Sequence, residues 1–251
     1  MFDYNALLNE MNRHTDESYR QFTQKLLPGT DGILGIRLPQ LRKIAKQIPH
    51  HEMESYFSQV QYESFEETML MGFVIGEMST RYFPLKQIMN QIKEFLIHIS
   101  NWSVCDSFCA SLKIAKKEQE AMFDFLLEVY ELSMKGSHDS SKDFSLRFVI
   151  VMWLDYYLND TYIPIILEKL RRISSQAYYV NMAIAWCQSA IYTKNDSLIT
   201  NMLEGNFIQK NCMNQNEIFV HNKTIQKICE SLKVDTIKKE NIKKLRLSSN
   251  V

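Results

Sequence analysis

A tryptophan and an aspartate stand four residues apart in segment 101–109, which reads NWSVCDSFC. Apolar residues recur around them at helical spacing, so Trp102 and Asp106 are expected to share one face of a helix. A carboxylate at this position could stabilise a positive charge that develops during a reaction, and an indole face attracts the same cation. Without further context, a structural interpretation is simpler: Trp102 belongs to the core, and the helix dipole favours Asp106 in the first turn.

The composition indicates a helical protein with a large core. The chain has 251 residues, of which 45% are hydrophobic, and it contains only 7 glycines and 5 prolines. These values exclude a disordered chain and argue against a loop-rich β fold. The 29 Lys and Arg residues equal the 29 Asp and Glu residues in number. A chain without net charge creates no global field for polyanions, which argues against avid nucleic-acid binding.

The cysteines and the N-terminus indicate the cellular compartment in which the protein is expected. The five cysteines are Cys105, Cys109, Cys187, Cys212 and Cys229. No pair has C-x-x-C spacing and their number is odd, so we expect reduced thiols and no metal site. The N-terminus lacks the basic and apolar regions of a signal peptide, and apolar runs such as 69–75 are too short to span a bilayer. We therefore expect a cytoplasmic, soluble monomer with no cofactor and no membrane partner.

The hydrophobic period is helical along nearly the whole chain. Helices are expected at 4–13, 16–27, 39–48, 52–59, 63–78, 84–99, 118–134, 145–154, 161–173, 178–187, 196–204, 223–233 and 236–247, and the helix that contains Trp102 follows 84–99. Segment 27–35 carries three glycines and a proline, which predicts a turn and loop. We expect no β-sheet.

Three of these helices, 63–78, 145–154 and 178–187, are apolar on almost every side, and each follows a more amphipathic one. Arg147 and Trp186 occupy two of them, 39 residues apart, which is a typical period for two-helix repeats of the HEAT type. The sequence therefore predicts an all-α solenoid of HEAT-like repeats, about twelve to fourteen helices in one domain over residues 1–251. A compact helical bundle is the alternative. Gly72 and Gly76 should let another helix approach closely.

Five segments, taken together in their order and spacing, resemble the DNA alkylation repair family, the AlkD-type glycosylases built from HEAT-like repeats. These segments are 33–43 (ILGIRLPQLRK), 101–106, 146–148 (LRF), 178–186 (YYVNMAIAW) and 222–228 (NKTIQKI). The resemblance covers almost the whole chain. It implies a concave, basic groove that holds duplex DNA and the hydrolysis of the N-glycosidic bond of cationic 3- or 7-alkylpurines.

The resemblance also implies roles for individual residues. A cationic purine is already a good leaving group, so the enzyme mainly stabilises the oxocarbenium-like sugar and admits water, without a deep base pocket. By position, Asp106 corresponds to the catalytic carboxylate, and Trp102 and Trp186 to its flanking indoles. Arg147 would hold a phosphate, and Lys113 and Lys227 would also contact the DNA backbone. Trp102, Asp106, Arg147 and Trp186 are then expected to converge on the concave surface.

Three features favour an alternative, a catalytically weak or inactive paralogue that binds the DNA backbone weakly. Segment 28–32 reads PGTDG, where glycosylase members resemble one another in a short aromatic-rich helix that reaches the minor groove. Trp186 is followed by segment 187–190 (CQSA), which lacks the arginine expected from glycosylase members, and the net charge is zero. Duplex affinity is then expected in the non-specific range, roughly 10⁻⁴–10⁻⁶ M. A protein-binding HEAT scaffold is disfavoured, because it gives no reason for the four site residues to occur together.

Other conspicuous residues have structural interpretations. Trp153 and Tyr156 are expected in the core. His50, His51 and His221 have no partner pattern and are expected on the surface. The lysine-rich run 238–244 is typical of a solvated helix face.

Overall fold

A computed structural model describes residues 2–135 and 140–248, and within them every regular element is a helix. The only β pairing in this part of the chain is an isolated bridge between Thr15 and Ile36. The all-α prediction is confirmed. The described residues form fifteen α-helices, one more than expected, because a four-residue helix, α8 (Ile114–Lys117), follows segment 102–111. No described helix combines the length and the apolar character that crossing a membrane requires.

The backbone contacts divide the chain into two compact units, Met1–Ser145 and Leu146–Val251. The boundary falls within helix α10 (Ser140–Tyr156). The single repeat domain over residues 1–251 stays a prediction.

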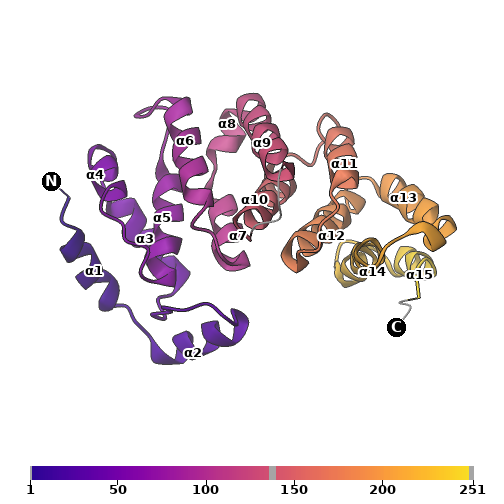
Figure 1. The fold of residues 1–251 in the computed structure, drawn as a ribbon, viewed down its shortest axis with the longest axis horizontal. Helices are drawn as coiled ribbons and strands as arrows, with labels where there is room; N and C mark the ends of the chain where they lie inside the picture. Colours follow the sequence, from indigo (N-terminus) through magenta and orange to yellow (C-terminus); the bar gives the residue numbers. More distant parts are fainter. Residues whose placement is uncertain (1, 136–139, 249–251) are drawn as a thin grey trace. The chain divides into compact units, whose positions relative to one another are not determined.

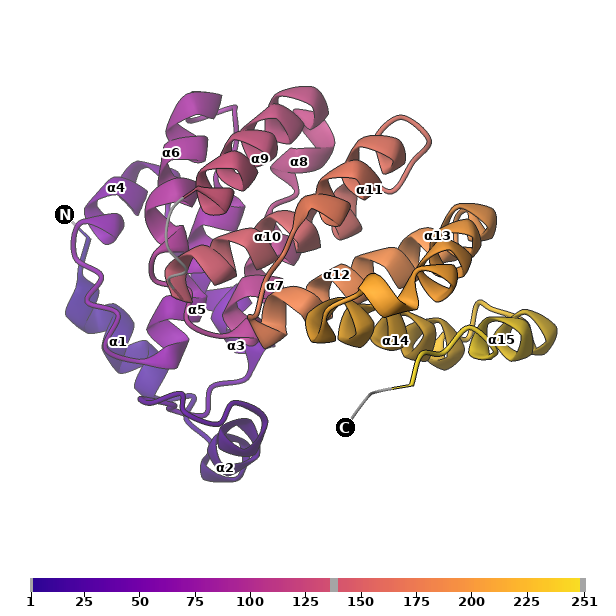
Figure 2. The same cartoon turned by 45° about the vertical axis from the view of Figure 1, so that its right-hand side comes forward.

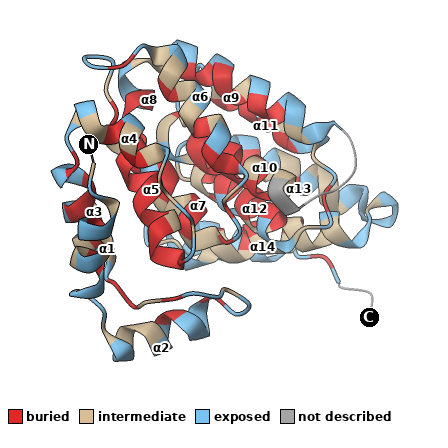
Figure 3. Cartoon of the chain, turned by 60° about the vertical axis from the view of Figure 1, so that its left-hand side comes forward, coloured by how far each residue is buried: buried red, intermediate tan, exposed pale blue. Residues whose placement is uncertain are grey.

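Unit 1 is built around α5 (Phe65–Glu77), which packs against α3 (Leu38–Gln47) and against α7 (Trp102–Ser111) (Figure 1). Its other elements are α1 (Tyr4–Asn12), α2 (Glu17–Leu26), η1 (His50–Glu52), α4 (Met53–Phe57), α6 (Leu85–Leu96), α8 and α9 (Gln119–Met134). A capping box starts α5: the Ser64 side chain accepts from the backbone N–H of Glu67, and Glu67 reaches back to the N–H of Ser64. Nearly all of α5 is buried (Figure 3), as its continuous apolar sequence predicts.

Two glycines allow α7 to lie close to α5. A Cβ atom on Gly72 would stand 3.3 Å from the Phe108 ring, and one on Gly76 would overlap the Ser111 side chain. The Ser111 hydroxyl also donates a hydrogen bond to the carbonyl of Gly72 at 3.4 Å. The prediction that both glycines serve helix packing is confirmed, and this packing fixes the position of α7.

Unit 2 is built around α12 (Tyr178–Tyr192), which packs against α14 (Gln215–Glu230) and α13 (Asp196–Ile208), and to a smaller extent against α11 (Ile163–Arg172) (Figure 2). The short η2 (Lys210–Cys212) and α15 (Thr236–Lys243) complete the unit. A buried hydrogen bond from the Thr224 hydroxyl to the Gln188 side chain, 2.7 Å long, joins α14 to α12. Gln188 therefore has a packing role in the segment that follows Trp186.

Three predictions in unit 2 were wrong in detail. Helix α14 begins at Gln215 and not at residue 223, because Asn214 and Glu217 form a capping box there. His221 is buried: one ring nitrogen lies 2.8 Å from the Leu245 carbonyl oxygen, so it is not a surface residue. Trp153 is fully buried, as expected, but Tyr156 is only half-buried, because α10 ends there and the core position passes to Tyr157.

Candidate functional site

Helix α7 presents the pair that the sequence singled out. Its N-cap is Asn101, whose side chain accepts a hydrogen bond from the backbone N–H of Val104 at 3.0 Å. The buried residues of the helix are Val104, Cys105, Phe108, Cys109 and Ser111. Trp102 and Asp106 lie one turn apart on the remaining side and are half-buried. The prediction that they share a helix face is confirmed, and their partial exposure leaves both within reach of a ligand.

Arg42 of α3 approaches the same helix. Its guanidinium donates a hydrogen bond to the Ser107 carbonyl at 3.5 Å and lies 4.0 Å from the centroid of the Phe73 ring. A cation is therefore held beside the residue that follows Asp106. Arg42 lies within segment 33–43, but no role could be predicted for it from sequence, since no local spacing links positions 65 residues apart.

Lys113 is exposed just beyond the C-terminal end of α7. Seven residues separate it from Asp106, which corresponds to about 10 Å along a helix. Lys113 is thus available for a backbone phosphate, but it belongs to the opposite end of α7 from Trp102. Its assignment as a DNA contact stays a prediction.

In unit 2, Trp186 and Lys227 lie together. Trp186 of α12 is 36% exposed, and the Lys227 Nζ of α14 lies 5.9 Å from the centroid of its ring system. This separation is within the range of a cation–π interaction. The structure therefore brings two of the predicted site residues onto one surface, from helices that pack against each other.

Arg147 occupies a different environment from the one expected of a phosphate ligand. It is 5% exposed, and its guanidinium donates a hydrogen bond to the Tyr179 carbonyl at 2.7 Å while lying 6.0 Å from the Tyr179 ring. Arg147 thereby attaches α10 to the first turn of α12. Its contact with phosphate stays a prediction.

The predicted site residues thus form two groups, one on α7 of unit 1 and one on α10, α12 and α14 of unit 2. Their convergence on one concave surface stays a prediction. Cys187, next to Trp186, offers no nucleophile, because burial raises the pKa of its thiol to about 12. Asp106 is the one carboxylate among the predicted site residues, which makes it the candidate for stabilising positive charge. Among the described residues, no three His, Cys, Asp or Glu side chains are grouped as metal ligands would be.

The segment that precedes α3 is a loop, and its prediction as non-helical is confirmed. The buried carboxylate of Glu66 accepts three hydrogen bonds from the backbone N–H groups of Leu34, Gly35 and Ile36, between 2.7 and 3.1 Å. Burial raises the pKa of Glu66, and the three donors act against that shift. Gly35 has a φ of 88°, and a Cβ there would overlap the Asp16 carbonyl. This loop is therefore fixed from within the fold.

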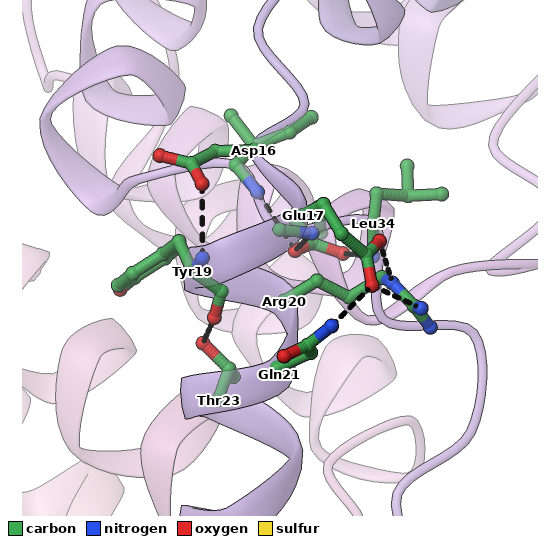
Figure 4. Close-up of polar contacts among 10 residues, drawn as sticks. Asp16, Glu17, Tyr19, Arg20, Gln21, Thr23 and Leu34 are labelled. Carbon is green, nitrogen blue, oxygen red and sulfur yellow. Dashed lines mark hydrogen bonds and ion pairs between the residues drawn. The ribbon is translucent and has the colours of Figure 1, made fainter.

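Helix α2, before the loop, is held mostly by polar contacts (Figure 4). Asp16 caps it by accepting from the Tyr19 N–H at 3.0 Å, and Glu17 pairs with Arg20 through two 2.7 Å contacts. Arg20, followed by Gln21, lowers the pKa of Glu17 to about 2. Only Thr23 of this helix is buried, while Phe22 and Leu26 are 56% and 48% exposed. Helix α2 thus presents an aromatic and an aliphatic side chain to solvent.

A family model described as DNA alkylation repair enzyme matches residues 7–218. The chain belongs to the DNA alkylation repair enzyme family. No curated protein matches the chain. The range that matches the DNA alkylation repair model includes Trp102, Asp106, Arg147 and Trp186, but it ends before Lys227. Membership supports a role in DNA repair and contact with DNA.

Proposed function

We propose that this member of the DNA alkylation repair family is a glycosylase that hydrolyses the N-glycosidic bond of cationic 3- or 7-alkylpurines in duplex DNA. The observation that carries the proposal is the pairing of Trp102 with Asp106, one turn apart on the accessible side of α7. A half-buried carboxylate beside an indole is suited to a cationic transition state, because both groups favour positive charge.

The reaction requires little from the protein. The bond between the sugar C1′ and the purine nitrogen breaks, its electron pair leaves with the base, and the base becomes neutral. Positive charge moves to the sugar, where the Asp106 carboxylate stabilises it. Water then adds to C1′ and loses a proton to the carboxylate or to solvent. Trp102 would border the sugar beside Asp106, and Arg42 would hold the backbone of α7 next to Asp106.

The packing of alternate helices supports the HEAT-like repeats that this function would use. Helix α5 contacts α3 and α7, and α12 contacts α14, as the inner helices of stacked helix pairs do. Lys227 beside Trp186, and the exposed Lys113, would supply phosphate contacts to duplex DNA bound by a monomer. Helix α2 exposes Phe22 in its second half, so a helix with an exposed aromatic side chain precedes segment 33–43.

The loop favours a second candidate, a DNA-backbone binding module with weak or no glycosylase activity. Segment 28–32 forms no helix, and the Glu66 carboxylate fixes the residues after it. Proteins that neutralise DNA phosphates derive much of their affinity from positive charge. Because the net charge of this chain is zero, we expect it to bind duplex DNA weakly. Such a module would bind duplexes without releasing bases.

Base release separates the two candidates. Alkylated duplex DNA is incubated at low salt with the wild-type protein and with Asp106→Asn, and free 7-methylguanine is measured. Loss of the carboxylate should slow release by about 10²–10³-fold, the usual effect of removing one electrostatic stabiliser. Asp124→Asn is the matched control, because Asp124 is exposed on α9 of the same unit.

Equal release by the wild-type protein and Asp106→Asn would remove Asp106 from the mechanism. Duplex binding without any release would favour the binding module. Binding by Asp106→Asn should match that of the wild type, because the carboxylate makes no favourable contact with phosphate.

A further inference from the structure

Unit 2 contains a pocket of about 620 Å³, whose lining residues include neither Trp186 nor Lys227. It is lined by the first turns of α12, by α14 and by the segment that follows α15, three elements that Figure 2 shows near one another. The C-terminal wall is fixed by Asn222, whose side chain donates to the Leu247 carbonyl and accepts from the Leu247 N–H, both at 2.9 Å. Its size is that of a small-molecule site.

The pocket is positively charged although the whole chain is neutral. Lys223 and Arg246 line it, and no Asp or Glu does. The Lys223 ammonium donates to the Gln226 side chain at 2.8 Å, a neutral partner that leaves its charge uncompensated. Segment 223–246 carries eight Lys or Arg residues against three Asp or Glu. The occupant that suits this charge is an anion.

Aromatic rings form one wall of the pocket. Tyr178 is 55% exposed, and its ring centroid lies 5.8 Å from that of Phe219. The Lys223 ammonium lies 5.9 Å from the Phe219 centroid. An exposed ring next to a cation provides a stacking surface for a planar, anionic ligand.

Amide side chains make up half of the lining, six of its twelve residues. Asn181 and Asn222 are engaged by backbone groups, which fixes their orientation. The side-chain amides of Gln176 and Asn216 make no hydrogen bond within the described part of the chain. Amides pair with the donor and acceptor edges of nucleobases, adenine above all. Stacking, amides and cations together match a nucleotide better than a simple anion.

We propose that this pocket binds one unpaired nucleotide of a DNA strand, with the base on Tyr178 and its phosphate between Lys223 and Arg246. The choice of a DNA strand over a free nucleotide rests on the proposed function, since a repair protein meets strands with unpaired residues. The pocket would take a nucleotide that is already extrahelical, and no base needs to be extracted for glycosidic cleavage at Asp106.

The test compares a labelled duplex carrying one bulged adenine nucleotide with the fully paired duplex, by fluorescence anisotropy at low salt. The wild-type protein should bind the bulged duplex at least about fivefold more tightly, the lower end of what stacking of one base provides. Tyr178→Ala should abolish this preference, whereas Tyr178→Phe, which keeps the ring, should retain it. Tyr82→Ala is the matched control, because Tyr82 is 53% exposed in unit 1.

Arg246→Gln should also reduce the preference, while Lys243→Gln, an exposed cation outside the pocket, should not. Equal affinity of the wild-type protein for both duplexes overturns the proposal. The proposal is also overturned if deoxyadenosine monophosphate binds the pocket while a bulge does not change duplex affinity. That result would assign the pocket to free nucleotides. Base release without bulge preference would leave the glycosylase proposal intact. A preference for the bulged duplex without base release would support the nucleotide pocket and contradict the glycosylase proposal.

Discussion

The carboxylate of Glu66 accepts a hydrogen bond from the backbone N–H of Gly35 at 2.7 Å, and this contact organises the loop before α3. Glu66 is fully buried, and its two oxygens together satisfy the N–H groups of three consecutive residues. A buried donor without an acceptor is costly, so the loop and α5 depend on each other. The motif that contains Gly35 therefore has a structural explanation independent of DNA.

Glu66→Gln tests this relationship. The amide keeps one acceptor oxygen but turns an NH₂ group toward backbone donors, so we expect unfolding free energy to fall by about 1–3 kcal/mol. Glu63→Gln changes an exposed residue nearby and should stay within about 0.5 kcal/mol of the wild type. Denaturant unfolding monitored by circular dichroism measures both. Equal midpoints for the two variants would show that the loop does not need the carboxylate.

The sequence predicted the helices well, because burial on one face repeats every three to four residues. It missed the start of α14, although Asn214 and Glu217 have the spacing of a capping box. It also misassigned His221, although His221, Thr224, Ile225 and Ile228 have the spacing of one buried face. Both signals were local and could have been used.

Other features of the site had no local signal. Arg42 meets Ser107 across 65 residues, and the nucleotide pocket combines residues from α12, α14 and the C-terminal segment. Such contacts depend on how the helices pack against one another. The period of hydrophobic residues along the sequence does not determine this packing. Trp102 and Asp106 could be paired from sequence only because they lie one turn apart on the same helix.

Two glycine substitutions should have opposite effects on stability, because Gly76 lies in the close packing of α5 and α7 and Gly205 lies in open space. Gly76→Ala places a Cβ against Ser111, so it should destabilise the protein by about 1–3 kcal/mol through overpacking. Gly205→Ala, on α13, has no atom within 4 Å of the new Cβ and should gain about 0.5–1 kcal/mol of helix propensity. Thermal melts compare them directly. A stabilising Gly76→Ala would mean that α7 can move away from α5 at no cost.

His221 predicts a loss of stability in mild acid. Burial lowers its pKa below the ordinary 6.5, while the Leu245 carbonyl acts in the opposite direction. Between the two pKa values the unfolded chain binds more protons, so the contribution of His221 is complete above about pH 6.5 and is lost as the pH falls toward its folded pKa. His221→Gln, which retains a donor for the carbonyl, should flatten the dependence of the melting temperature on pH in that range.

The control for this effect is His51→Gln, since His51 is exposed. It should leave the slope of melting temperature against pH unchanged. A His221→Gln variant with the slope of the wild-type protein would assign the acid sensitivity to other groups, of which His98, also lowered in pKa by burial, is the first candidate.

The salt dependence of duplex binding should separate Lys227 and Arg147, the two residues of unit 2 that were predicted to contact phosphate. Each phosphate contact contributes about 0.9 to the slope of log K against log salt concentration, so Lys227→Gln should reduce the slope by about one without changing the melting temperature. Arg147→Gln should reduce the slope by a similar amount but also lower the melting temperature, because Arg147 is 5% exposed and donates to the Tyr179 carbonyl. Lys194→Gln removes an exposed cation of the same unit and controls for net charge. If Arg147→Gln lowers only the melting temperature, the guanidinium serves the attachment of α12 to α10, and the phosphate contact belongs to another residue.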